Sequence, residues 1–345
     1  MSCAILETSP ALVENGDIHC GFFKTPFRRV NLLDARNPGG PLGRPFRRFR
    51  LKEWVGFGIN HPRVYGSVLI QNARYAASGT FYVYDKERKH MCDRTMIANP
   101  FRVHLPETLW GGSTRCLCRD GWITFEHDLE NGRHRVKADI QKTANAPAIY
   151  ADLVFHQDLK AVEPLVVSLP IPPKHHTYTH KSPLRIEGVV RIDAVECQFD
   201  PARDRGNLDE QKTFYPYRSQ WLWGCFSGFS TQGREVMVNF VNQMTAKGAP
   251  DEDAMWVDGR IMLLGPVVFI READARTFRI EDMAGRVRLR FREQGAKTER
   301  RHYGIIAMDY AQHFGPYDGV VVDDQGTEHI IRDQFGALEE MKARF

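Results

Sequence analysis

The sequence has no long hydrophobic run and no secretory signal. No apolar stretch reaches the ~20 residues that a membrane-spanning helix needs. The first ten residues also lack the basic and apolar regions of a signal peptide. The seven cysteines are odd in number and scattered, which is typical of reduced thiols in a cytosol rather than of a disulfide framework. We therefore expect a cytoplasmic protein without a transmembrane segment.

The common catalytic motifs are missing too. There is no P-loop, no Rossmann glycine pattern and no HExxH, and in Gly224-Cys-Phe-Ser-Gly228 the serine lies one position away from that of a nucleophile elbow. These absences disfavour NTPases, dehydrogenases and ordinary serine hydrolases. The net charge of +4 is too small to indicate a nucleic-acid surface. We interpret Arg44–Arg50 as a strand or arm with solvated arginines, and binding of phosphate or a single strand as the alternative.

What the sequence does contain is a long series of short, β-branched or aromatic segments with turn residues between them. Val287–Arg292 alternates apolar and charged residues, which indicates one buried and one solvated strand face. Glu130-Asn131-Gly132 is a strong hairpin turn. No segment among the early strands has helical periodicity. The expected strands are 50–59, 65–71, 76–85, 114–119, 121–128, 134–140, 150–157, 184–193, 195–199, 219–229, 235–243, 254–264, 267–271, 278–280, 287–292, 303–310, 319–322 and 326–331.

The length of 345 residues favours two domains over one core. Four prolines within Val162–Pro173 suggest a crossover between two halves. We expect an all-β fold of two antiparallel barrels in tandem, with domains at 1–165 (including an irregular N-terminal arm) and 166–345. Gln334–Phe345 is the one segment with helical spacing of apolar residues, and it predicts a short C-terminal helix.

The aromatic segment Thr213–Phe229 dominates the second half. Strand alternation predicts that Trp221 and Trp223 share one face and that Arg218 points to the other. Two indoles on one face suit a packed core or the wall of an apolar cavity. Trp54 and Trp256 have the same two interpretations.

Several polar residues are candidates for chemistry. His176, Tyr178 and His180 would share a strand face; facing inward they could hold a metal with a carboxylate such as Glu328 or supply a general acid, and facing outward they are surface residues. Glu328 itself is the preferred acid, because an apolar barrel would keep it protonated; a surface role is the alternative. The remaining candidates are Asp209 paired with Arg218, as substrate contact or structural salt bridge, and Asn239 as a polar contact.

Seven short motifs occur in an order that resembles an uncharacterised bacterial family, a domain of unknown function, over about Phe22 to Phe335. They are Lys52-Glu-Trp54, Tyr178-Thr-His-Lys181, Trp221-Leu-Trp223, Val238-Asn-Phe240, Met255-Trp-Val-Asp-Gly259, Gln312-His-Phe-Gly315 and Gly326-Thr-Glu-His329. That family is similar to the calycin-like two-barrel proteins, which include carotenoid hydratases and some fungal pericyclic cyclases. The resemblance implies lipocalin-like barrels and a polyene-, terpenoid- or lipid-like ligand.

Together these observations predict a tryptophan-lined site, in the C-terminal barrel or between the halves, for a small hydrophobic molecule. The first hypothesis is a hydratase, isomerase or cyclase without cofactor or metal, with catalytic residues among Glu328, Asp209 and His180 and substrate contacts from Trp54, Tyr178, Arg218, Trp221, Trp223, Asn239 and Trp256. The second is a ligand-binding protein without chemistry. The third is a carbohydrate-active enzyme with Asp209 and Glu328 as paired carboxylates.

Overall fold

The computed structural model describes residues 4–36, 43–242, 244–246 and 248–345, and it is built almost entirely of antiparallel strands. It divides into two compact units. The C-terminal unit comprises Met1–Ile5, Leu169–Pro173 and Tyr215–Phe345, and the N-terminal unit comprises Leu6–Ser168 and Lys174–Phe214. The all-β expectation is confirmed. The division differs from the expected boundary after residue 165, because the strands between 175 and 214 pair with strands of the N-terminal unit.

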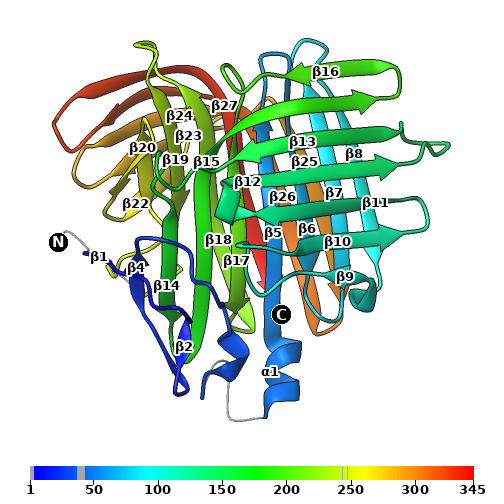
Figure 1. Ribbon diagram of the computed structural model, residues 1–345. Helices are drawn as coiled ribbons and strands as arrows, with labels where there is room; N and C mark the ends of the chain where they lie inside the picture. Colours follow the sequence, from blue (N-terminus) through cyan, green and yellow to red (C-terminus); the bar gives the residue numbers. More distant parts are fainter. Residues whose placement is uncertain (1–3, 37–42, 243, 247) are drawn as a thin grey trace. The chain divides into compact units, whose positions relative to one another are not determined.

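The N-terminal unit contains one large sheet that nearly closes into a barrel (Figure 1). The last strands approach the first, since Cys118 Sγ of β10 lies 3.6 Å from the Ile97 carbonyl oxygen of β8. Its main path, in spatial order, is β8 (His90–Ala98), β7 (Ala77–Asp85), β6 (Val64–Asn72), β5 (Leu51–Asn60), β17 (Arg205–Phe214), β15 (His175–Ile192), β13 (Ile149–His156), β12 (Arg133–Ile140), β11 (Gly121–Asp128), β10 (Ser113–Cys118) and β9 (Val103–His104).

Alternate residues of these strands fill the barrel interior. On β13 every second residue from Ile149 to Phe155 is buried. The Phe57 ring packs against Phe125 at 5.2 Å and against Phe155 at 4.6 Å between centroids. Such contacts bury large apolar side chains whose removal from water drives folding. The interior is therefore apolar over much of its length.

The barrel end at which β5 begins is covered by the N-terminal arm. This arm contains β1 (Ile5–Leu6), β2 (Val13–Glu14), β3 (Asp17–Ile18), β4 (Gly21–Phe23) and η1 (Leu32–Asp34), and β4 pairs with β14 (Leu165–Ile171). Phe27, which is fully buried, packs against the Tyr178 ring at 6.2 Å. Two 3-10 turns, η2 (Pro100–Arg102) and η3 (Leu129–Asn131), and strand β16 (Val195–Phe199) complete this unit.

Arg44–Arg50 forms the helix α1 directly before β5 (Figure 1). The strand expected here is wrong, whereas Arg44 and Arg48 are solvated as expected. Pro45 lies in the first turn of the helix, where its fixed φ angle favours helix formation and its missing N–H costs nothing.

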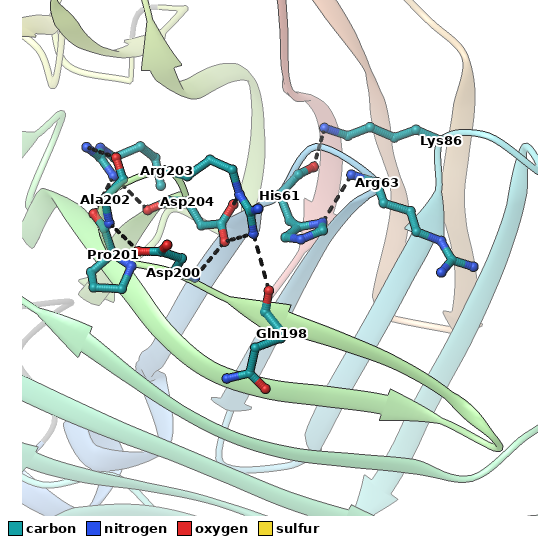
Figure 2. A network of polar contacts seen from close by, with 10 residues as sticks. His61, Arg63, Lys86, Gln198, Asp200, Pro201, Ala202, Arg203 and Asp204 are labelled. Carbon is teal, nitrogen blue, oxygen red and sulfur yellow. Dashed lines mark hydrogen bonds and ion pairs between the residues drawn. The ribbon is translucent and has the colours of Figure 1, made fainter.

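The opposite barrel end, where β5 finishes, is held by a polar network (Figure 2). Asp204 is fully buried and accepts hydrogen bonds from Arg203 Nε at 3.0 Å and from the Asp200 backbone N–H at 2.8 Å. Lys86 Nζ donates to the His61 carbonyl oxygen at 2.8 Å. These bonds satisfy loop groups that would otherwise be buried without partners.

The C-terminal unit has a second antiparallel sheet with its core on one face. Phe226, Val238 and Leu338 belong to this core. In spatial order the strands are β21 (Arg260–Leu263), β20 (Ala254–Val257), β19 (Glu235–Val241), β18 (Arg218–Phe229), β27 (Glu328–Arg344), β26 (Ile306–Val322), β24 (Val287–Arg292), β23 (Thr277–Asp282) and β22 (Val267–Arg271), and β25 (Gly295–Tyr303) pairs with β26.

The predicted C-terminal helix is wrong, because Gln334–Phe345 lies in or directly after strand β27. This strand pairs with β18 on one side and β26 on the other, and Leu338 lies opposite both Gly224 and His313. Within β27 the stretch Phe335–Leu338 is buried on both faces, so its apolar residues follow no strict alternation. Phe335 and Met341 therefore lie on one face of β27 and Leu338 on the other, rather than on one side of a helix.

Candidate functional site

The structure distributes the predicted site residues over both units. The N-terminal unit holds Trp54, Tyr178, His180 and Asp209, and the C-terminal unit holds Arg218, Trp221, Trp223, Asn239, Trp256 and Glu328. We describe the two groups separately.

The tryptophans of the C-terminal unit lie on the sheet face opposite the core. On β18, Phe226 faces the core, so Trp221 and Trp223, at odd numbers, point to the other side. The register places Asn239 of β19 opposite Cys225, and thus on the same face. Trp256 of β20 lies opposite Met237, on this face too. We call Trp221, Trp223, Asn239, Trp256 and Glu339 the tryptophan face.

Both β18 indoles on this face donate hydrogen bonds to polar side chains. Trp223 Nε1 donates to Asn239 Oδ1 at 2.8 Å, and Trp221 Nε1 donates to Glu339 Oε1 at 2.9 Å. Asn239 is fully buried and its Nδ2 donates to the Glu252 carbonyl oxygen at 2.7 Å, which fixes the direction of the amide. The indoles are therefore held in defined orientations by polar groups that occupy the same face.

Exposure distinguishes the three indoles. Trp256 is buried and Trp221 is 8% exposed, with its ring stacked on Tyr215 at 5.2 Å and 15°. Trp223 is only half-buried. Among the three, Trp223 thus has the most surface available to a ligand.

Glu339 was missed by the sequence interpretation. The sequence predicts a helix for the segment that contains it, and a helix does not place Glu339 beside the indoles of β18. On a strand, Glu339 lies directly opposite Trp223 and alternates with Leu338, which faces the core. Gln312 Nε2 of β26 donates to the second oxygen of Glu339 at 3.3 Å.

Glu328 is not in an apolar interior. It is exposed at the start of β27 and forms an ion pair with Arg288 at 2.8 Å between Nη2 and Oε1. The prediction that an apolar environment keeps Glu328 protonated is wrong. Strand alternation directs its neighbour His329 inward and leaves Glu328 in solvent. His329 is buried and contacts Asp323 at 3.0 Å.

The expected ion pair between Asp209 and Arg218 is also wrong. The register of β15 and β17 places Lys181 directly opposite Asp209, and Lys181 Nζ donates to Asp209 Oδ1 at 2.7 Å. Arg218 is exposed at the first position of β18. Trp54 lies on β5 opposite Gln211, on the barrel face away from Phe57.

Inside the N-terminal barrel, the predicted histidine cluster is part of a longer buried network. The histidine network consists of Thr114, His127, His134, Gln157, His180 and Glu210, each buried. Consecutive members are 2.8, 3.1, 3.0, 2.8 and 3.4 Å apart between their nearest polar atoms. Sequence reasoning found only His180 of these six, because the others are spread over five further strands or loops.

The hydrogen bonds assign one tautomer each to His134 and His127. The Gln157 carbonyl oxygen can only accept, so His134 donates from Nε2 and accepts at Nδ1 from His127. Burial lowers the pKa of His134 to about 4 and, with the neighbouring His134, holds the pKa of His127 well below its usual value. Both are thus neutral. At the other end Gln157 Nε2 donates to His180 Nε2, and His180 Nδ1 faces Glu210 Oε2 at 3.4 Å.

The network ends in polar atoms without hydrogen bonds. Within the described residues, neither His180 Nδ1 nor Glu210 Oε1 has a hydrogen-bond partner, although both are buried. Tyr178 is two positions from His180 on the same face of β15; burial, and then the charge of Glu210, hold its pKa well above the usual value. The Tyr178 hydroxyl is likewise buried without a hydrogen-bond partner among the described residues.

The described residues around these histidines include no set of metal ligands. His176 Nε2 is 2.7 Å from Ser168 Oγ. Over the ranges that the structure describes, no group of three or more His, Cys, Asp or Glu side chains is arranged to hold a metal ion. No described helix is long and apolar enough to cross a membrane.

Comparison with known proteins gives a family and a fold. The family described as "Domain of unknown function (DUF2804)" matches residues 4–345. No curated protein matches the chain. A crystal structure of CghA is 11% identical over 98% of this chain and 97% of that one, with a TM-score of 0.55. CghA with Sch210972 is 10% identical over 85% and 88%, with a TM-score of 0.51. A Nitrosomonas europaea protein assigned as AttH is 12% identical over 85% and 93%, with a TM-score of 0.52. The expected membership of a family described as a domain of unknown function is confirmed, and the chain shares its fold with these solved structures.

Proposed function

The chain belongs to the DUF2804 family, and we propose that its C-terminal unit binds a small hydrophobic molecule, lipid-, polyene- or terpenoid-like, against the tryptophan face. The observation that carries this proposal is the gathering of three indoles with Asn239 and Glu339 on one side of one sheet. Indole rings supply large apolar contact areas, and a few fixed polar groups orient the oxygen atoms of a ligand.

The relatives in fold support a ligand-binding role. CghA, which shares the fold, has been crystallised with Sch210972. We further propose that each unit is a lipocalin-like barrel, so that the chain is a tandem of two. The nearly closed sheet of the N-terminal unit supports this arrangement.

Binding can be tested with cis-parinaric acid, a polyene fatty acid that accepts energy from excited tryptophan. We expect saturable energy transfer in the wild-type protein and a Kd about tenfold higher for Trp223→Ala, since a well-packed indole contributes about 1–3 kcal/mol. Trp110→Ala is a matched control, because that half-buried indole lies in the N-terminal unit and donates to the Pro26 carbonyl oxygen. Equal weakening by both variants would contradict a site at the tryptophan face.

A second candidate function is acid–base catalysis inside the N-terminal barrel. It is favoured by the buried polar atoms of Tyr178, His180 and Glu210. Glu210 would take a proton from a carbon beside a carbonyl group, the neutral Tyr178 O–H and His180 N–H would stabilise the enolate oxygen, and Glu210 would return the proton to a different carbon. This is isomerase chemistry without a cofactor, and it replaces Glu328 as the catalytic carboxyl group.

Deuterium uptake tests this second function without knowledge of the substrate. A molecule that co-purifies with the protein is incubated in D₂O with the wild type and with Glu210→Gln, and its mass is then measured. We expect uptake at carbon with the wild type and none with the variant. Asp209→Asn, on the opposite face of the same strand, is the control and should leave uptake unchanged. Equal uptake with wild type and Glu210→Gln would exclude Glu210 as the base.

A further inference from the structure

One end of the N-terminal barrel exposes phenylalanines together with arginines. Phe101 is 98% exposed, and Phe49 and Phe46 are 46% and 41% exposed. Arg48 and Arg102 are exposed as well. Such large apolar side chains are normally buried, and several of them at one place mark a contact surface.

These residues come from two elements that flank the same turn. The turn 73–76 joins β6 to β7. On one side, Lys52 Nζ donates to both the Phe49 and the Ala73 carbonyl oxygens at 2.9 Å, which ties the end of α1 to the turn. On the other side, Asn72 Nδ2 donates to the Pro100 carbonyl oxygen at 3.0 Å, which ties η2 to it. We call Phe46, Arg48, Phe49, Arg74, Phe101 and Arg102 the arginine–phenylalanine end.

The positive charge at this end exceeds the negative charge. Arg74 pairs with Glu53, but Arg48 and Arg102 form no ion pair within the described ranges. Burial, followed by the charges of Arg50 and Arg74, lowers the pKa of the adjacent Lys52 to about 7. Cations so close together repel one another, and an anionic partner would relieve that repulsion.

We propose that the arginine–phenylalanine end docks on an anionic lipid bilayer. The phenyl rings of Phe46, Phe49 and Phe101 enter the boundary between head groups and acyl chains, while Arg48 and Arg102 bind lipid phosphates. A bilayer offers apolar depth and negative charge on one surface, which matches this combination of side chains. A second copy of the chain fits less well, because a symmetric contact would bring two sets of arginines together. The inference goes beyond ligand binding and does not depend on it.

Vesicle sedimentation tests the proposal on the full chain. The probes are vesicles of phosphatidylcholine mixed with phosphatidylserine and vesicles of phosphatidylcholine alone, each at low and high salt. We expect sedimentation with the anionic vesicles, weakened by salt because screening shortens the reach of the arginine charges. Protein that remains in the supernatant with both kinds of vesicle would overturn the proposal.

Two pairs of variants separate the apolar and charged parts. Phe46→Ser with Phe101→Ser should weaken binding to anionic vesicles by about tenfold or more, and Arg48→Glu with Arg102→Glu should abolish it. Met283→Ser and Ile305→Ser, exposed at 89% and 75% in the other unit, are matched controls and should bind as the wild type. Wild-type binding by the phenylalanine or arginine variants would contradict the proposal. So would arginine-dependent binding of a single-stranded oligonucleotide without binding of vesicles, which would assign this end to nucleic acid.

Discussion

At the scale of single residues, burial keeps imidazoles of the N-terminal barrel neutral. Burial lowers the pKa of both His134 and His176 to about 4, from 6.5 for a solvated imidazole. As the pH falls through this window the unfolded chain binds protons that the folded chain does not. Stability from these groups is therefore complete above about pH 6.5 and is lost between about 6.5 and 4.

Lowering the pH from 7 to 5 should thus destabilise the protein by roughly 2 kcal/mol per buried imidazole. The measurement is urea unfolding at both pH values. His134→Gln, which retains a group able to hydrogen-bond, should show a smaller loss. An unfolding free energy that does not change between pH 7 and 5 would mean that these imidazoles are solvated.

Trp221 and Trp223 differ in what they contribute although they share a face. Trp221 is nearly buried and stacks on Tyr215, so Trp221→Ala should lower stability by about 3–5 kcal/mol. Trp223 is half-buried, and Trp223→Ala should affect ligand affinity more than stability. Melting temperature and cis-parinaric acid binding, measured for both variants, check this division. The reverse pattern would show that Trp223 is the structural residue and Trp221 the ligand contact.

At the scale of elements, pairing with two neighbouring strands makes Gln334–Arg344 part of strand β27, although its apolar residues have helical spacing. Where it crosses β18, a Cβ atom on Gly336 would lie 2.3 Å from the Cys225 carbonyl oxygen. Gly336→Ala should therefore cost about 1–3 kcal/mol or more, because backbone would have to move. Gly265→Ala, where a Cβ atom would have no neighbour within 4 Å, should be nearly neutral. Chemical denaturation compares the two, and equal stabilities would argue against this close pairing.

Strands whose sequence alternates or is rich in β-branched and aromatic residues could be predicted, whereas a polar strand such as β17 and a segment with helix-like apolar spacing such as the end of β27 could not. Val287–Arg292 matches β24 and Gly121–Asp128 matches β11, because alternation and turn residues both indicated them. The polar run of β17, Arg205–Phe214, was missed, since its side chains read as a loop although nearly all of them are buried. Glu210 lies in β17 and Glu339 in the part of β27 for which the sequence predicts a helix. The face to which a side chain points can be predicted only when its strand is recognised, so neither residue was identified.

At the scale of the whole molecule, each of the two units has a large hydrophobic core of its own. The N-terminal core surrounds Phe57 and Phe155, and the C-terminal core surrounds Phe226 and Leu338. Separate cores predict more than one cooperative transition. Calorimetry of the wild type and Gly336→Ala should show one transition shifted to lower temperature and the other retained. A single transition that shifts as a whole would show that the units unfold together.

The central claim is that the tryptophan face holds a small hydrophobic molecule. Native mass spectrometry of the protein purified from its own host tests this most directly. The account predicts a bound small apolar molecule in the wild type, lost or strongly reduced in Trp223→Ala and retained in Trp110→Ala. No bound molecule in the wild type, or equal occupancy in wild type and Trp223→Ala, would contradict it.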